Sequence, residues 1–149
     1  MTTVVLDTNI LLRLVHVSAP EHRTCQEAVR CLDKLGCELA ITSPIAVEFW
    51  VVATRPTEVN GLGWTPAIAR TKLNEILAQV RVLAEPAEVI RLWLDLVTSC
   101  AISGKRAHDV RIAASMRASS VRHLLTLNPS DFASIPDITS IHPAGPIAL

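Results

Sequence analysis

Three acidic residues, Asp7, Glu48 and Asp109, occupy positions where a carboxylate commonly does chemistry. Asp7 follows the apolar run Val4-Val5-Leu6, which predicts a buried parallel strand. The carboxyl ends of such strands open into the ligand crevice of an α/β sheet, and the alternative is an Asp that only caps the next helix. Glu48 and Asp109 lie at helical spacing from apolar residues, so we expect both on the core-facing sides of their helices.

A cation is the expected partner of these acids. The apolar residues that define the two helical faces are Ile45, Phe49 and Val52 for Glu48, and Ile112, Ala113 and Met116 for Asp109. An unpaired buried carboxylate is strongly destabilising, so positive charge must lie nearby on an Arg or Lys side chain or on a metal ion. We favour Mg²⁺ or Mn²⁺, because hard oxygen ligands without adjacent His or Cys suit these ions better than zinc. Such a site leaves positions for phosphate oxygens and is typical of phosphodiester cleavage.

Further polar residues follow the penultimate predicted strand. Thr126 and Asn128 fall at its carboxyl end, where they would face the same crevice as Asp7, and Asp131 comes one turn later. Turn chemistry explains Asn128 and Asp131 equally well, because both residue types favour turns and caps. Either Asn128 or Asp131 could therefore occupy the fourth position of the acidic site, beside Asp7, Glu48 and Asp109.

Length and composition limit the kind of protein. The chain has 149 residues, of which 50% are hydrophobic and 19% charged, which excludes disorder and predicts a single domain over residues 1–149. Fourteen basic and fourteen acidic residues give no net charge, so a polyanion would have to be bound locally. The four cysteines form no Cys-x-x-Cys pair, and we expect reduced core thiols. No apolar run is long enough for a membrane helix, so a soluble, cytoplasmic protein is expected.

Strands alternate with helices along the chain, which predicts a parallel sheet covered by helices on both faces. The expected strands are 4–6, 38–42, 80–83, 123–127 and 138–141. The expected helices are 10–16, 20–35, 43–53, 65–79, 85–103 and 107–118. Polar residues at the strand ends should then gather at one edge of the sheet.

Taken together, these motifs resemble the PIN-domain ribonucleases, and most closely the VapC toxins of toxin-antitoxin pairs. The resemblance rests on Leu6-Asp7-Thr8-Asn9, Glu48, Asp109-x-x-Ile112-Ala113-Ala114 and Thr126-x-Asn128-x-x-Asp131-Phe132. It implies a three-layer α/β/α sandwich with a five-stranded parallel sheet, an acidic pocket for Mg²⁺ or Mn²⁺, and endonucleolytic cleavage of RNA. It also implies a homodimer and an antitoxin protein that covers the pocket.

The resemblance assigns roles to individual residues. Asp7, Glu48 and Asp109 match the family's acidic positions and would hold the metal, and Asp131 is the fourth catalytic candidate. The residues that would orient the acids are Thr8, Asn9, Thr126 and Asn128. The basic residues expected near the RNA are Arg13, Lys105 and Arg106. In this hypothesis the metal activates a water molecule and polarises the scissile phosphate, while nearby basic residues offset charge in the transition state.

Other classes of protein share some of these features. A haloacid-dehalogenase-type phosphatase also has an apolar strand that ends on Asp, but its chemistry needs a second acid two residues later, where this chain has Asn9. A housekeeping PIN nuclease of RNA maturation would need no antitoxin. A PIN scaffold without turnover would bind only RNA or protein, and its function would survive removal of Asp7 or Asp109.

Overall fold

Five parallel strands form the centre of the structure, a computed structural model that describes residues 1–149. Their order is β3-β2-β1-β4-β5, so β1 lies between β2 and β4. In register, Val5 of β1 pairs with Ala40 of β2 and Leu124 of β4. The strands span Thr3–Leu6 (β1), Glu38–Ile41 (β2), Arg81–Val82 (β3), His123–Leu125 (β4) and Thr139–Ile141 (β5). The predicted five-stranded parallel sheet is confirmed.

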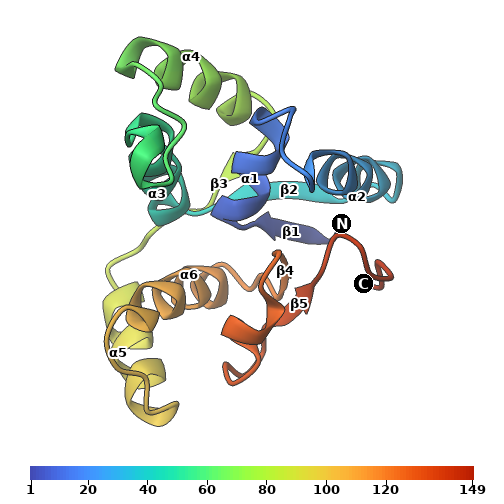
Figure 1. The fold of residues 1–149 in the computed structure, drawn as a ribbon. Coiled ribbons are helices and arrows are strands. Elements are labelled where there is room, and N and C mark those ends of the chain that lie inside the picture. The colour runs from blue at the N-terminus through green and yellow to red at the C-terminus, as the bar shows by residue number, and fades with distance from the viewer.

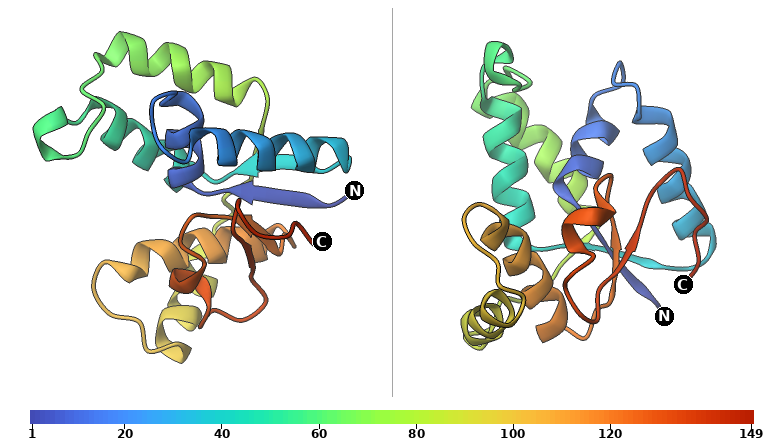
Figure 2. Two further views of the ribbon diagram at one scale, coloured as in Figure 1. Left: turned by 45° about the vertical axis from the view of Figure 1, so that its right-hand side comes forward. Right: turned by 60° about the horizontal axis from the view of Figure 1, so that its bottom comes forward.

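Helices form a layer on each side of this sheet. The α-helices span Thr8–Val15 (α1), His22–Lys34 (α2), Ser43–Thr54 (α3), Pro66–Leu77 (α4), Val89–Ser99 (α5) and Arg106–Ala118 (α6). Two short 3₁₀ helices, Thr57–Val59 (η1) and Pro129–Phe132 (η2), complete the elements. Helices α1 to α4 cover one face and α5 and α6 cover the other (Figures 1 and 2). The three-layer α/β/α sandwich is therefore as predicted.

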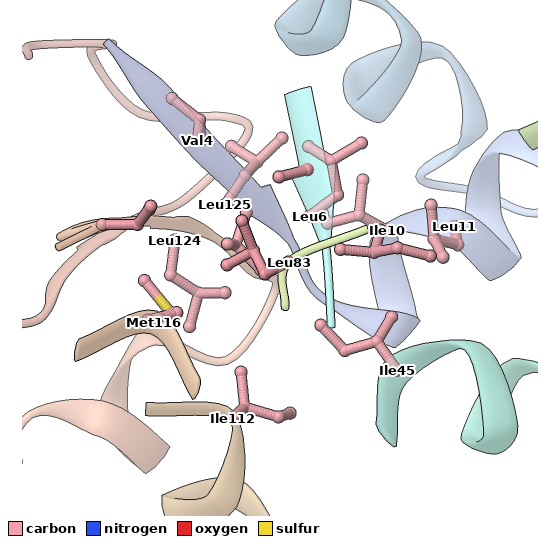
Figure 3. Close-up of a cluster of buried hydrophobic side chains, with 14 of the residues drawn as sticks. Val4, Leu6, Ile10, Leu11, Ile45, Leu83, Ile112, Met116, Leu124 and Leu125 are labelled. Atoms are coloured by element: carbon pink, nitrogen blue, oxygen red, sulfur yellow. The ribbon is translucent and has the colours of Figure 1, made fainter. Parts of the chain in front are cut away.

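The core is built around the two central strands. Val4 and Val5 of β1 and Leu124 and Leu125 of β4 are fully buried, as expected for strands of a parallel sheet that is covered on both faces. Figure 3 shows side chains of α6 packed near β4, and side chains of α1 and α3 packed near β1. This packing fixes the helices that carry the candidate acids relative to the strand ends.

The chain leaves β1 and β4 in opposite directions across the sheet. The connection after β1 leads to β2, whereas the connection after β4 leads to β5 on the other side. The adjacent carboxyl ends of β1 and β4 therefore form a topological switch point, which is where open α/β sheets bind ligands. Asp7 follows β1 at this point, and Thr126 follows β4.

The fifth α-helix is shorter than predicted at both ends. It begins at Val89 rather than at residue 85, and it ends at Ser99 rather than near residue 103. Its end is a Schellman motif: Ile102 N–H donates to Val97 O (2.9 Å) and Ala101 N–H to Thr98 O (3.2 Å). Ala101 takes the left-handed conformation (φ 52°), and so does Gly104 (φ 66°) a few residues later.

Several smaller expectations were wrong. Strand β3 has two residues instead of the predicted four, and the 3₁₀ helices η1 and η2 follow α3 and β4. The hydroxyl of Thr42 caps α3 by accepting a hydrogen bond from Ile45 N–H. Only Cys25 is a core thiol, because Cys31 is exposed and the other two cysteines are partly exposed. None of the helices combines the length and apolarity that crossing a bilayer requires.

Candidate active site

Asp7 lies at the switch point and is both a helix cap and a buried acid. It is the N-cap of α1, and its Oδ1 accepts a hydrogen bond from Thr8 N–H at 2.8 Å. Its Oδ2 accepts from the hydroxyl of Thr126 at 2.8 Å and from Asn9 Nδ2 at 3.3 Å. The side chain is 8% exposed, and this burial raises the pKa of Asp7. The Thr126 and Thr8 hydrogen bonds oppose that rise, while the nearby charges of Glu48 and Asp131 add to it.

Thr126 and Asn9 fasten the end of β4 to the start of α1. The Thr126 hydroxyl is fully buried, donates to Asp7 and accepts from the backbone N–H of Asn128 at 3.1 Å. Asn9 Oδ1 accepts from the backbone N–H of Leu127 at 3.1 Å. Because the two side chains that donate to Asp7, Thr126 and Asn9, are themselves held by backbone N–H groups at the end of the neighbouring strand, the orientation of the Asp7 carboxylate is fixed.

Glu48 reaches the site from α3, although it is not where the sequence placed it. It is exposed, whereas the buried side of α3 consists of Ile45, Phe49 and Ala53, which follow each other at intervals of four residues. Glu48 precedes Phe49 by one residue and so points about 100° away from the centre of that buried side. Its Oε2 accepts a hydrogen bond from the buried Thr8 hydroxyl at 3.0 Å. The expectation that Glu48 faces the core was therefore wrong. Its hydrogen bond with Thr8 nevertheless joins it to the residue that directly follows Asp7.

Asp109 lies in the first turn of α6 and is partly buried. Burial, together with the carboxylates of Asp131, Asp7 and Glu48 in decreasing order, raises the pKa of Asp109 from 3.8 to about 6. The charge of Arg106 partly offsets this rise. Carboxylates from four separate elements therefore lie near enough to influence one another at this edge of the sheet.

The last two candidates, Asp131 and Asn128, lie in and just before η2. Both are exposed, and the Asn128 side chain makes no hydrogen bond within the chain. Asp131 adds negative charge beside Asp7 and Asp109, whereas Asn128 contributes its backbone N–H to Thr126. Of these two residues, Asp131 is therefore the one that adds a negative charge to Asp7, Glu48 and Asp109.

The three basic candidates differ in position. Arg13 is in the last turn of α1, whereas Asp7 caps the first, and its Nε pairs with Glu21 at 3.0 Å. Arg106 donates from Nη2 to the backbone oxygen of Asp131 at 3.3 Å, which places it beside the acids. Lys105 directly precedes α6 and is exposed. Arg13 is thus already paired, and Arg106 is the basic residue in contact with the site.

The donor set fits a hard divalent cation. None of the four acids takes part in any of the structure's ion pairs. Asp7 accepts one hydrogen bond on Oδ1 and two on Oδ2, so one lone pair of Oδ1 remains free. No three His, Cys, Asp or Glu side chains converge closely enough to enclose a metal ion. One or two carboxylates with water is nonetheless how proteins commonly bind Mg²⁺.

Two contacts at the site have no counterpart in the sequence pattern. The bond from Thr8 to Glu48 joins α1 to α3, and the bond from Leu127 to Asn9 joins β4 to α1. Side-chain spacing carries no signal for the second bond, because its donor is a backbone group. The first could have been anticipated only from the position of Thr8 at the start of α1.

Comparison with known proteins identifies the family and the fold of the chain. A family model described as the PIN domain matches residues 4–137. No curated protein matches the chain significantly. Among solved structures, VapBC2 from Rickettsia felis, bound to a DNA fragment from their promoter, has a TM-score of 0.73 at 19% identity, over 95% of this chain and 98% of that one.

Two further structures show the same fold. VapBC-1 from nontypeable Haemophilus influenzae has a TM-score of 0.73 at 16% identity, over 97% of this chain and 100% of that one. Mycobacterium tuberculosis VapC20, described as a Sarcin-Ricin loop cleaving toxin, has a TM-score of 0.59 at 17% identity, over 81% and 86% of the two chains. At such low identity these likenesses establish the fold alone.

Proposed function

The chain belongs to the PIN-domain family, and on that premise we propose that it is a metal-dependent endoribonuclease and the toxin of a toxin-antitoxin pair. The observation that carries the proposal is that Asp7, Glu48, Asp109 and Asp131, from four elements, lie near enough to influence one another electrostatically and have no basic ion-pair partner. Solved toxin-antitoxin structures with the same fold support the toxin role.

Asp7 and Asp109 would hold one Mg²⁺ or Mn²⁺ ion with help from Glu48. When bound, the cation supplies positive charge next to a scissile phosphate and lowers the pKa of the attacking water. The chain's own contribution is orientation: Thr126, Thr8 and Asn9 fix Asp7, and Thr8 also restrains Glu48. Burial and the neighbouring carboxylates raise the pKa of Asp109 to about 6, so this acid becomes ionised as the pH rises through that value.

RNA would approach the site along the N-terminal end of α6. Arg106 contacts Asp131 there and is exposed, so its guanidinium is available to a phosphate of the substrate. Lys105 is exposed beside it. Arg13 remains a weaker candidate because binding phosphate would require its release from Glu21. The chain's net neutrality is compatible with this local binding.

The partners in this proposal are a cognate antitoxin and a second copy of the chain. Each of two helices exposes a pair of apolar side chains one turn apart, Val47 and Val51 on α3 and Ile90 and Leu94 on α5. Exposed apolar surface of this kind supports association with protein partners. Light scattering on the purified chain, with and without the candidate antitoxin, measures both assembly states.

A two-part experiment tests the function. Expression of the wild-type chain should arrest growth, a small protein encoded next to it should reverse the arrest, and Asp7→Asn should abolish it. In vitro, the purified chain should cleave purified ribosomal or transfer RNA with Mg²⁺ or Mn²⁺ but not with EDTA. Asp95→Asn, which changes an exposed acid on α5 without hydrogen bonds or ion pairs, should retain activity.

Each negative result has a distinct meaning. Cleavage without growth arrest, and without an antitoxin gene nearby, would favour a housekeeping nuclease. RNA binding without cleavage, unchanged by Asp7→Asn, would favour a scaffold and overturn the proposed activity.

A further inference from the structure

The first turn of α6, which carries Asp109, has no capping side chain. Lys105 precedes the helix in a helical conformation, and its side chain makes no cap hydrogen bond. Short-range backbone bonds run from Ala107 N–H to Gly104 O and from His108 N–H to Lys105 O, each 3.1 Å. Uncapped helix ends fray more readily than capped ones. Something other than a cap must therefore hold Asp109 in place.

On the side that faces α5, the first turn of α6 borders an open depression. The depression has a volume of about 500 Å³, and its lining includes Ala107, His108 and Arg111 from α6. Side chains that face such a depression make fewer packing contacts on that side. Individual polar contacts at this face therefore help to hold the turn, in addition to the bond from Arg106 to the backbone oxygen of Asp131.

Two polar contacts from the preceding segment provide that support. The indole Nε1 of Trp93 on α5 donates to the backbone oxygen of Ala107 at 2.8 Å. Glu85 Oε1 accepts from Nη2 and Nε of Arg111 at 2.7 and 3.1 Å. The two anchoring points bracket Asp109, two residues before it and two residues after it.

We propose that Trp93 is a positioning residue for the cleavage reaction, supported by the Glu85–Arg111 pair. Its indole N–H holds the first turn of α6 so that the Asp109 carboxylate stays in the acidic site. The indole suits this task, because it is a rigid group with one donor and no acceptor. This inference rests on the proposed nuclease function, and it concerns a residue whose hydrogen bond goes to the backbone of α6 and not to any of the four acids.

The test compares Trp93→Phe with Trp64→Phe. The first variant removes the hydrogen-bond donor and keeps an aromatic ring, and the second removes an indole that makes no hydrogen bond in the structure. We expect Trp93→Phe to lower kcat about tenfold and to leave KM within about twofold, because small misplacements of catalytic groups reduce rate rather than substrate binding. Trp64→Phe should match the wild type in both constants. The substrate is the ribosomal or transfer RNA that the wild type cleaves.

Hydrogen-deuterium exchange supplies a readout that does not depend on activity. Without metal, Trp93→Phe should speed exchange of the amides of residues 106–111 and leave α3 unchanged. Glu85→Gln provides a second variant, with an expected loss of about threefold in kcat, and Glu75→Gln, which breaks an exposed pair with Lys72, is its control.

The outcomes separate the two proposals. An active wild type with unchanged kcat and exchange in both Trp93→Phe and Glu85→Gln overturns the positioning role alone. A fall in kcat for Glu85→Gln with faster exchange of the same turn supports the role even if Trp93→Phe folds poorly. A wild type that cleaves no RNA overturns the function and, with it, the role of Trp93 in that reaction.

Discussion

Replacing Asp109 with Asn should stabilise the metal-free protein while it removes activity. In the folded chain the pKa of Asp109 rises from 3.8 to about 6, chiefly through burial and then through the charges of Asp131, Asp7 and Glu48. A raised carboxyl pKa means that this group favours the folded state when protonated and opposes it when ionised. The contribution is therefore fully present below about pH 4 and is lost as the pH rises through 6.

The size of the effect follows from the two pKa values. The pKa of Asp109 differs by roughly two units between the folded and unfolded states, which corresponds to about 3 kcal/mol at about 1.36 kcal/mol for each pKa unit. Partial exposure of the Asp109 side chain to solvent reduces this figure to about 1–2 kcal/mol. In a domain of this size, that difference raises Tm by roughly 3–6 °C at pH 7.5.

The assay is thermal and urea unfolding in EDTA between pH 4.5 and 8. Asp109→Asn should gain stability over the wild type as the pH rises, with little difference near pH 4.5. Adding Mg²⁺ should raise the Tm of the wild type more than that of the variant. Asp95→Asn, which changes an acid outside the cluster, should stay within about 0.5 kcal/mol of the wild type throughout. An Asp109→Asn protein that is no more stable than wild type at pH 7.5 would refute the electrostatic reasoning.

Further predictions concern the acidic site, the contacts of Thr126 and the end of α5. Asp131→Asn should lower the pKa of Asp109, which NMR titration of the Asp109 carboxyl carbon would measure. Asp137→Asn, which changes an acid paired with Arg117, should leave that pKa unchanged. Cleavage by the wild type should decline below about pH 6. Thr126→Val should cost about 2 kcal/mol in urea unfolding, because Asp7 and the Asn128 N–H each lose a buried partner, and Thr126→Ser should cost less than half as much. Ala101→Gly should stabilise the chain by about 0.5 kcal/mol, because glycine adopts the left-handed conformation without strain; a loss of stability would contradict the Schellman assignment.

The strand-end part of the site was predictable because it depends on backbone periodicity. An apolar run that ends on Asp7, and another that ends on Thr126, place both residues at one edge of a parallel sheet whatever the details of packing. The hydrogen bond between their side chains then follows from the adjacency of β1 and β4. Sequence order alone does not reveal that adjacency, which comes from the strand order of the sheet.

Features that depend on helix rotation or on single backbone angles were not predictable. The exposure of Glu48 depends on whether the buried side of α3 centres on Phe49 or on a neighbour, and several apolar residues allow either choice. The end of α5 depends on Ala101, a residue type that seldom adopts a positive φ. The bond from Trp93 to Ala107 involves a backbone acceptor, and no spacing rule encodes such a contact.

The separation of the acids along the chain has a kinetic consequence. Asp7, Glu48, Asp109 and Asp131 meet only after β1 has paired with β2 and β4, and such distant parallel pairings are slow to form. Their mutual repulsion is therefore weak in the unfolded chain and reaches full strength only in the native state. Interactions that form after the transition state change the unfolding rate and leave the folding rate almost unaltered. We therefore expect the acidic site to act mainly on the unfolding rate, and a bound cation to slow unfolding.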